Sequence, residues 1–369
     1  MPRTLLHVFP SFAVGGQQTR FATIAGRLER PYRHLVVSLD GRDMARGLVP
    51  SSVALEMRAA PGSRGPAHRF AAIAAAIREA RPDALVTYNW GAIEWAAANR
   101  LVAGRPPHVH LEDGFGPDEA DRQHGRRVFA RRVVLRGSEV VVPSHVLARI
   151  AVETWRLPAA RVSYVANGID AARFDAVPDT SALFDRRGAS FVLGTVAPLR
   201  AEKNLGRLLR AFARIGGDAL LVIAGDGPER APLGAMAEQL GMTGRVVFTG
   251  HVSPPERIIG GFDAFAITSD TEQMPYAVLE AMSAGLPLAG TAVGDVPTMV
   301  SEANRPFIVP RDAPDRLVDA IEALRADPAR RRLIGAANRA EVRARFTIEQ
   351  MSTAFAAILD RAIGAGCGG

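Results

Sequence analysis

The chain of 369 residues is too long for one ordinary core and has the length of two domains of typical size. Hydrophobic residues make up 48% of it and charged residues 22%, a composition that excludes an intrinsically disordered chain. The formal net charge of +7 favours anionic partners, namely nucleic acid, phosphorylated ligands or an acidic membrane surface, without choosing among them.

A single cysteine, Cys367, excludes an intrachain disulfide framework, so a reducing cytoplasmic setting is expected. The apolar run at the amino terminus is shorter than that of a signal peptide. No stretch approaches the roughly 18 uncharged apolar residues of a membrane-spanning helix. We therefore expect a cytoplasmic protein, either soluble or peripheral on the inner face of the membrane.

Short β-branched runs alternate with longer amphipathic patterns in the first half of the chain. The runs typical of strands are residues 5–9, 34–39, 84–87, 139–143 and 162–165. The patterns typical of helices are residues 18–28, 69–80 and 145–155. This alternation predicts a mainly parallel sheet that is covered by helices.

A second series of the same kind begins after Gly168. Its predicted strands are residues 191–196, 219–224, 245–249, 264–268, 287–290 and 307–309. Its predicted helices are residues 205–215, 228–240, 275–284 and 315–325. Because residues 170–188 have the composition of a linker, we expect two open sheets in series. A single eight-stranded barrel is the alternative that the strand count allows.

The predicted architecture is thus an N-terminal Rossmann-like domain at residues 1–168 and a C-terminal one at residues 169–345. A final helix within residues 346–369 has no strand after it and must bury an apolar face. Its apolar face would come from Phe346, Phe355 and Ile358. We expect this helix to pack back across the domains, ahead of a short Gly-rich tail.

In open α/β sheets, ligands bind beyond the carboxyl ends of the strands, so two such sheets predict a site in the cleft between them. Gly15 and Gly16 follow the first strand and precede the first helix. Glycines let the backbone come close to a ligand, and a helix amino terminus offers N–H groups to a phosphate. The alternative is a plain strand-to-helix turn.

Two strand ends of the second series carry groups that suit a diphosphate. After its first strand come Arg200 and Lys203, which combine fixed positive charge with the start of a helix. The alternative is a solvated charged loop. After its second strand come Gly225, Asp226 and Gly227, where the glycines suit close backbone approach, although Asp226 can equally cap the next helix.

The most specific element runs from Glu272 to Glu280. Pro275 opens a helix, which places Glu272 and Met274 in the loop before it and Glu280 more than one turn inside. Two carboxylates at different depths can accept from sugar and ribose hydroxyls, and the helix terminus favours a phosphate. The alternative is an exposed Glu280, but apolar residues surround it, and a buried Glu is rare without a partner.

In the first half, His110, Glu112 and Asp113 end a probable strand, and their side chains are expected to face the cleft on the acceptor side. The alternative is a polar loop with a capping Asp.

Six arginines lie between Arg122 and Arg136 among Val, Phe and Leu, and such a basic amphipathic helix can lie on an anionic membrane. The alternative is a solvated face. Nucleic-acid binding is not expected, because aromatic interleaving and a binding motif are missing.

With these motifs in this order, the chain resembles glycosyltransferase family 4, the retaining enzymes with the GT-B fold. The resemblance covers nearly the whole chain. It rests on the Gly-Gly loop, the segment from Val165 to Asp170, Glu202-Lys203-Asn204, the segment from Gly225 to Pro228, Phe248-Thr249-Gly250, and the Glu-x7-Glu element. Each motif alone is unspecific, and the ordered set is specific.

The resemblance implies that Lys203 binds the donor diphosphate, that Glu272 contacts the sugar and that Glu280 contacts the ribose. It also implies a nucleotide base near Gly225 and His251. No metal or other cofactor is expected, because cations and helix dipoles take its place.

Two positions depart from the family's pattern. Pro198 stands where the family has an Arg five residues before Lys203, and Arg200 is the expected substitute. Asp113 stands where the family commonly has a His. A carboxylate can bind a sugar hydroxyl but cannot donate an imidazole-type hydrogen bond, which affects the acceptor side and not the donor site.

The expected reaction is transfer of a hexose from a UDP- or GDP-sugar to a glycan or lipid-linked acceptor with retention, in the synthesis of surface or extracellular polysaccharide. Lys203, Arg200 and N–H groups near Gly16 would stabilise the leaving diphosphate. The alternatives are a nucleotide-sugar epimerase of the same fold and an inactive nucleotide-sugar-binding scaffold. A Rossmann dehydrogenase is not expected, because the GxGxxG fingerprint is absent.

Overall fold

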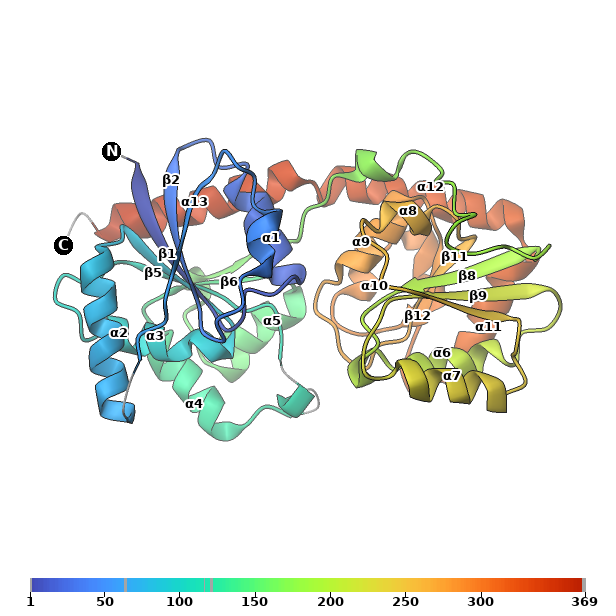
Figure 1. Cartoon of the computed structure of the whole chain (residues 1–369), viewed down its shortest axis with the longest axis horizontal. Coiled ribbons are helices and arrows are strands. Elements are labelled where there is room, and N and C mark those ends of the chain that lie inside the picture. The colour runs from blue at the N-terminus through green and yellow to red at the C-terminus, as the bar shows by residue number, and fades with distance from the viewer. Residues whose placement is uncertain (1, 63–64, 116, 120–121, 367–369) are drawn as a thin grey trace. The chain divides into compact units, whose positions relative to one another are not determined.

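The computed structural model describes residues 2–62, 65–115, 117–119 and 122–366, and Cys367 lies outside them. By its internal contacts the chain divides into two compact units. Unit 1 comprises Met1–Gly168 together with Ile348–Gly369, and unit 2 comprises Ile169–Thr347. Each unit is built on its own parallel sheet with helices on it (Figure 1).

The sheet of unit 1 has seven strands in the order β3-β2-β1-β4-β5-β6-β7. They are β1 (Arg3–Phe9), β2 (Tyr32–Ser38), β3 (Ala54–Arg58), β4 (Ala84–Tyr88), β5 (His108–Leu111), β6 (Glu139–Val142) and β7 (Val162–Tyr164). All neighbouring pairs are parallel. The sequence pattern missed β3, because this edge strand is half-exposed and carries charged residues in place of a continuous apolar run.

Helices cover both faces of this sheet. They are α1 (Gly16–Ala25), α2 (Pro66–Ala80), α3 (Ile93–Asn99), α4 (Gly125–Val134), α5 (His145–Arg149) and α13 (Ile348–Gly366). One core cluster joins the sheet to α1 and α13, and another joins it to α2 and α3. The expected last helix therefore packs on the N-terminal sheet, with Phe355 and Ile358 in its buried face.

The inclusion of Phe346 in that face was wrong. Phe346 directly follows α12 (Pro328–Arg345), and its φ of −128° is outside the helical region. Its side chain is buried, and its carbonyl accepts from the backbone N–H of Ile169 at 2.9 Å, which places it in unit 2. The helix that packs on unit 1 starts two residues later.

The sheet of unit 2 has six strands in the order β10-β9-β8-β11-β12-β13. They are β8 (Phe191–Val196), β9 (Ala219–Ala224), β10 (Val246–Gly250), β11 (Ala264–Ile267), β12 (Leu288–Thr291) and β13 (Ile308–Val309). The helices are α6 (Leu205–Phe212), α7 (Arg230–Gln239), α8 (Glu256–Ile259), α9 (Tyr276–Ser283), α10 (Val296–Met299), α11 (Pro314–Ala326) and α12.

The order of strands reverses between β8 and β11 in unit 2 and between β1 and β4 in unit 1. This confirms two open Rossmann-like sheets and excludes a closed barrel. At such a reversal the two neighbouring strands send their following helices to opposite faces, which leaves a crevice at the carboxyl edge. In unit 2 the loops after β8 and β11 meet at this edge. No helix within the described ranges has the length and apolar content needed to cross a bilayer.

Candidate functional site

The strand reversal in unit 2 brings Lys203 and Glu272 together. Lys203 Nζ donates to Glu272 Oε1 at 2.5 Å, and Ser269 Oγ donates to the same oxygen at 2.7 Å. Lys203 follows β8 and Glu272 follows β11, so this contact is a direct result of the topology. Both side chains keep some exposure, 20% and 11%, which leaves the pair within reach of a ligand.

A set of polar contacts fixes the loop that carries Lys203. Asn204 adopts a left-handed conformation (φ 43°) and caps α6, its side chain accepting from the N–H of Arg207 at 3.1 Å. The Arg207 guanidinium donates to Asp270 Oδ1 at 2.7 Å, and the N–H of Asp270 donates to the carbonyl of Glu202 at 2.9 Å. The loops after β8 and β11 are therefore tied together on both sides of Lys203. Sequence reasoning gave no role to Arg207 or Asp270, since neither stands in a recognisable motif.

Gly225 serves the backbone of the neighbouring loop. It has a φ of 148°, and a Cβ on it would lie 1.8 Å from the carbonyl oxygen of Ala197. The N–H of Ala197 donates to the carbonyl of Ala224 at 3.0 Å, and the N–H of Leu199 donates to the backbone carbonyl of Asp226 at 2.9 Å. The sequence predicted that the backbone at Gly225 comes close to a ligand. In the structure it comes close to the backbone of the segment that leads to Arg200 and Lys203.

Gly294 supports the loop of Glu272 in a similar way. It has a φ of 53°, and a Cβ there would lie 2.2 Å from the carbonyl oxygen of Glu272. The next residue, Asp295, donates its N–H to the carbonyl of Gln273 at 2.9 Å. The loop after β12 therefore holds the backbone of the Glu272 loop in place.

Glu280 lies in α9 and is largely buried. Burial raises the pKa of its carboxyl group to about 7, the positive charge of Arg173 opposes this rise in pKa, and the negative charge of Glu256 adds to it. Arg173 is itself engaged with Glu256, in hydrogen bonds of 2.7–3.0 Å. No described residue makes a hydrogen bond to the Glu280 carboxyl, so this half-buried acceptor is available to a donor group.

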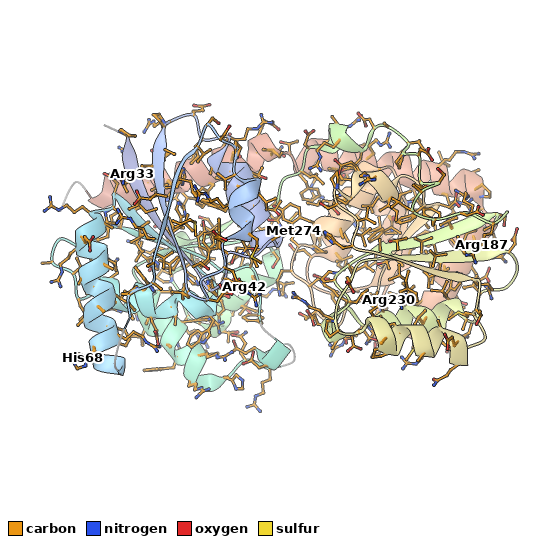
Figure 2. The ribbon with its side chains drawn as sticks, in the orientation of Figure 1. Arg33, Arg42, His68, Arg187, Arg230 and Met274 are labelled. Carbon is orange, nitrogen blue, oxygen red and sulfur yellow. The ribbon has the colours of Figure 1, made fainter. Side chains whose placement is uncertain are left out.

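The remaining predicted donor residues lie around this edge of unit 2. Arg200 is exposed, and no described carboxylate pairs with it. His251 is exposed directly after Gly250, whose carbonyl accepts from the N–H of Gly225 at 2.8 Å. Met274, labelled in Figure 2, precedes α9. Its side chain is buried. Pro275 is the N-cap residue of α9.

In unit 1 the Gly-Gly turn and Asp113 lie at one place. Gly15 has an extended backbone and precedes α1, which begins at Gly16. From the first turns of α1, Gln17 Nε2 and Arg20 Nη1 each donate to the Asp113 carboxylate at 3.0 Å. The Arg20 side chain is only 1% exposed and also donates to the carbonyl of Val165 at 2.9 Å. The charge of Asp113 is therefore balanced from within the unit.

The expectation that His110 and Glu112 face the open edge was wrong. Both side chains have 0% exposure, because β5 is a central strand of a sheet that is covered on both faces. Glu112 Oε2 instead accepts from Arg131 Nε at 3.2 Å and lies 3.5 Å from His110 Nε2. These two residues belong to the interior of unit 1.

They form part of a hydrogen-bonded chain along β5. Ser138 Oγ lies 2.7 Å from His108 Nδ1, and Thr87 Oγ1 lies 2.8 Å from both His108 Nε2 and His110 Nδ1. Because a carboxylate only accepts, Glu112 requires His110 to donate from Nε2. His110 Nδ1 then accepts from Thr87, Thr87 accepts from His108, and His108 accepts the proton of Ser138. Burial lowers the pKa of His108 to about 3, which keeps its ring neutral, as this chain requires.

Arg127 and Arg131 do not belong to an exposed basic face, contrary to the expectation for the segment up to Arg136. The Arg131 side chain is 1% exposed, and it pairs with Glu112 and Glu119. Its guanidinium also lies 4.9–5.4 Å from the ring centroids of Trp90, Phe115 and Trp155. Arg127 pairs with Asp118 and Glu119. The other four arginines of the segment are exposed.

Comparison with known proteins agrees with this geometry. A family model described as Glycosyltransferase Family 4 matches residues 14–173, and one described as Glycosyl transferases group 1 matches residues 184–341. The lipopolysaccharide core biosynthesis glycosyltransferase LpsD of Rhizobium meliloti (strain 1021) is 30% identical over 47% of this chain and 50% of its own. The chain thus matches half the length of that relative.

A second relative is matched over a longer stretch. The GDP-mannose-dependent alpha-(1-6)-phosphatidylinositol monomannoside mannosyltransferase of Mycobacterium tuberculosis (strain CDC 1551 / Oshkosh) is 29% identical over 72% of this chain and 70% of its own. Among solved structures, Anabaena HepE in complex with UDP has a TM-score of 0.82 at 20% identity, covering 97% of this chain and 100% of that one. WaaG, a glycosyltransferase of lipopolysaccharide biosynthesis, has a TM-score of 0.71 at 17% identity, covering 99% and 100%.

The role of Gly225 is testable by substitution. Gly225→Ala forces a Cβ against the Ala197 carbonyl at an unfavourable φ, so we expect a loss of about 2–4 kcal/mol in the free energy of unfolding. Urea denaturation followed by circular dichroism measures it. The control is Gly216→Ala, an exposed position where a Cβ meets no atom within 4 Å. Equal stability of the two variants would show that the loop accommodates a side chain at position 225.

Proposed function

The chain belongs to glycosyltransferase family 4, and on that premise we propose that it transfers a hexose from a UDP- or GDP-sugar to a glycan or lipid-linked acceptor, with retention. We further propose a place in the synthesis of surface or extracellular polysaccharide. The observation that carries the proposal is the contact between Lys203 and Glu272 at the strand reversal of unit 2. HepE was solved with UDP, and the mycobacterial relative is named for GDP-mannose, so both bases stay in the proposal.

Lys203 is the group proposed to bind the donor diphosphate. It is the only lysine of the sequence, although lysine and arginine together number 45. An ammonium group is a compact charge on a flexible stem, which can leave Glu272 for a diphosphate without the fixed geometry of a guanidinium. In the transition state the leaving diphosphate gains negative charge, which is stabilised by Lys203 and by Arg200, for which the described residues offer no carboxylate partner.

Glu272 is then available to the sugar. In the structure it holds Lys203, and once the diphosphate takes over that cation, its carboxylate can accept from two sugar hydroxyls. Ser269 keeps it oriented during this exchange. The contribution of Glu272 to the rate is that of positioning the reacting carbon.

Glu280 is proposed to accept from the ribose hydroxyls. Its carboxyl lies in a buried setting without a donor among the described residues, and its pKa of about 7 reflects that setting. Two vicinal hydroxyls donating to it favour the ionised form and lower the pKa. A base near Gly225 and His251 is consistent with the exposed position of His251 after β10.

In unit 1, the N–H groups at the start of α1, near Gly15 and Gly16, are proposed to contact the phosphates. Asp113 is proposed to accept from a sugar hydroxyl. Since Gln17 and Arg20 each donate to its carboxylate, it is a positioning group and not a free base. We propose that no metal takes part, because Lys203 and Arg200 supply the positive charge.

Lys203 and Glu280 give the direct test. Lys203→Ala is expected to lower kcat at least about 100-fold, because the leaving diphosphate loses its main cation. Glu280→Gln is expected to weaken donor binding about 10- to 100-fold, because a neutral amide replaces a charged acceptor. Release of nucleoside diphosphate, with donor and acceptor panels, measures both effects, and chelator should leave the wild-type rate unchanged.

The Glu280→Gln variant has a second expected signature. In the wild type, the raised pKa of Glu280 means that the folded chain holds the carboxyl proton more tightly than the unfolded chain, in which the pKa of the group is near 4.5. The stability so gained is complete below about pH 4.5 and is lost as the pH rises to about 7. The variant should therefore unfold at a higher temperature than the wild type at about pH 8 while it binds the donor more weakly.

Three outcomes would contradict the proposal. Normal turnover by Lys203→Ala would remove the assigned role of the lysine. Conversion of a UDP-sugar without an acceptor would identify an epimerase. Donor binding by the wild type without transfer to any acceptor, across panels in which related enzymes are active, would identify a binding scaffold.

We propose that unit 1 docks on an anionic membrane surface through the outer face of α4. Phe129 and Val133 are 65% and 45% exposed there, and the exposed arginines Arg126, Arg132 and Arg136 surround them. Residues 126, 129 and 133 recur at helical spacing and so share one face of α4, and Arg136 follows in the turn after the helix. Apolar side chains flanked by arginines suit insertion at the level of lipid headgroups.

Vesicle binding tests the α4 face. Replacing Phe129 by Ser together with Arg136→Glu should weaken sedimentation with phosphatidylglycerol vesicles at least about 10-fold, because it removes an apolar anchor and reverses a charge. Arg149→Glu, an exposed arginine of α5, is the charge-matched control. Equal binding by the two variants, or no binding by the wild type, would rule out docking through α4.

A further inference from the structure

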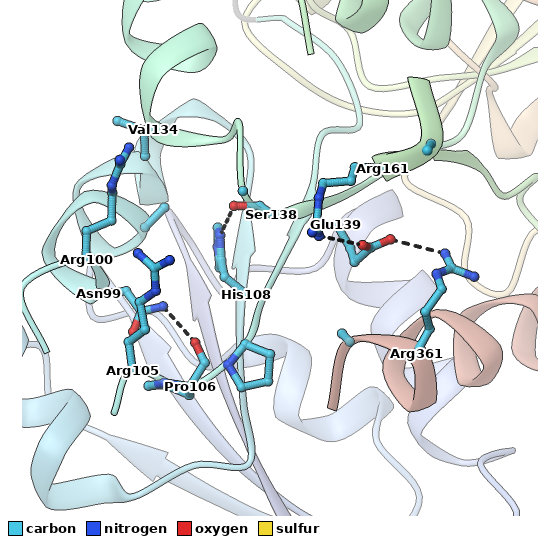
Figure 3. A pocket seen from close by; sticks show the side chains of 15 residues that line it. Asn99, Arg100, Arg105, Pro106, His108, Val134, Ser138, Glu139, Arg161 and Arg361 are labelled. Atoms are coloured by element: carbon cyan, nitrogen blue, oxygen red, sulfur yellow. Dashed lines mark hydrogen bonds and ion pairs between the residues drawn. The ribbon is translucent and has the colours of Figure 1, made fainter. Parts of the chain in front are cut away.

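Unit 1 contains a pocket at the edge of its sheet opposite to Asp113. The pocket has a volume of about 540 Å³ and lies where β5, β6 and β7 begin, so it is at the amino edge (Figure 3). Its lining comes from α3, the end of α4, the strand starts and α13. Pockets of this size hold small organic ligands. Neither the donor residues nor the α4 membrane face accounts for it.

Four arginines and a single carboxylate line the pocket. Arg161 and Arg361 share that carboxylate, Glu139, at 3.0 and 3.2 Å. Arg100 and Arg105 lie on the other side of the pocket (Figure 3). Arg105 has no partner among the described residues, and Arg100 donates only to the carbonyl of Val133, at 2.7 Å. The pocket therefore has an excess of positive charge that no carboxylate in the described part of unit 1 balances.

His108 and Ser138 lie between these two pairs of arginines (Figure 3). His108 adds no charge, because burial lowers its pKa to about 3. Ser138 commits its proton to His108, as required by the chain that ends at Glu112. The free lone pairs of Ser138 Oγ are consequently acceptors at the pocket, and they suit a hydroxyl group of a ligand.

We propose that this pocket binds a small hydroxylated phosphomonoester. A phosphomonoester carries a charge of about −1.5 to −2 and three strong acceptor oxygens, which matches arginines on two sides better than a singly charged diester does. Its hydroxyl groups find acceptors in Ser138 Oγ and the Glu139 carboxylate.

The phosphomonoester can come from solution or from a lipid headgroup. Val134 and Gly137, at the end of α4, line the pocket, so it adjoins the helix whose outer face we propose to meet the membrane. The chemistry recognised is the same in both cases. The proposal does not depend on the identity of the transferred sugar.

The soluble arm of the test is calorimetric titration with glycerol 3-phosphate, with glycerol as the uncharged probe. We expect binding of glycerol 3-phosphate and none of glycerol. Arg105→Ala, an exposed residue without a described partner, should weaken it about 10-fold. Arg149→Ala is the matched control and should bind as the wild type does. The lipid arm uses vesicles of matched surface charge that contain either phosphatidylinositol 4-phosphate, which carries a hydroxylated phosphomonoester, or phosphatidylinositol, which carries only the diester, and Arg105→Ala should remove any preference for phosphatidylinositol 4-phosphate.

If Arg105→Ala weakens the binding, the result supports a phosphomonoester site in the pocket. The arm of the test in which binding appears identifies the source of the ligand. Absence of binding in both arms overturns the proposal, and so does binding that is unchanged by Arg105→Ala. If Lys203→Ala loses binding of glycerol 3-phosphate and Arg105→Ala keeps it, the ligand binds at the donor site. That result would overturn the pocket and leave the proposed transferase function intact.

Discussion

The contact between Lys203 and Glu272 depends on the reversal of strand order in the sheet of unit 2. β8 and β11 are neighbours, and the loops at their carboxyl ends must share one edge. A cation and a carboxylate that are far apart in the chain are therefore brought to 2.5 Å of each other. The pair satisfies both charges, and a diphosphate with an attached sugar offers the same two groups alternative partners. The proposed donor chemistry thus depends on topology together with one exchangeable ion pair.

The rest of the edge keeps that pair in place. Asn204, Arg207 and Asp270 fasten the two loops to each other through side chains, and Gly225 and Gly294 allow the adjoining loops to pack by direct backbone contact. Glu280 lowers the free energy of unfolding at neutral pH, because its carboxyl is largely removed from water and has no hydrogen-bond donor in the described part of unit 2. Because Glu280 lowers stability at neutral pH and has no hydrogen-bond donor among the described residues, we propose that its use lies in ligand binding.

Much of this architecture was predictable from sequence, and the reasons for the exceptions are physical. β8 and β9 are nearly continuous apolar runs that are buried on both faces, so they were predicted at their observed residues. β3 lacks such a run and was missed. His110 and Glu112 were misplaced because polar residues at a strand end suggest a surface, whereas Thr87 pairs with His110 and Arg131 pairs with Glu112 inside the sheet. Hydrogen bonds between distant residues leave no local pattern in the sequence, and the same holds for the arginines of the amino-edge pocket.

The most direct measurement uses the fact that Lys203 is the only lysine. An amine-reactive probe has Lys203 and the terminal amino group to modify, and peptide mass spectrometry measures the two separately. If the sugar diphosphate binds at this edge, a saturating nucleotide-sugar that raises the melting temperature should slow modification of Lys203 and leave the terminal amine unaffected. Unchanged modification of Lys203 in the presence of a bound donor would contradict the account, because the diphosphate would then lie elsewhere.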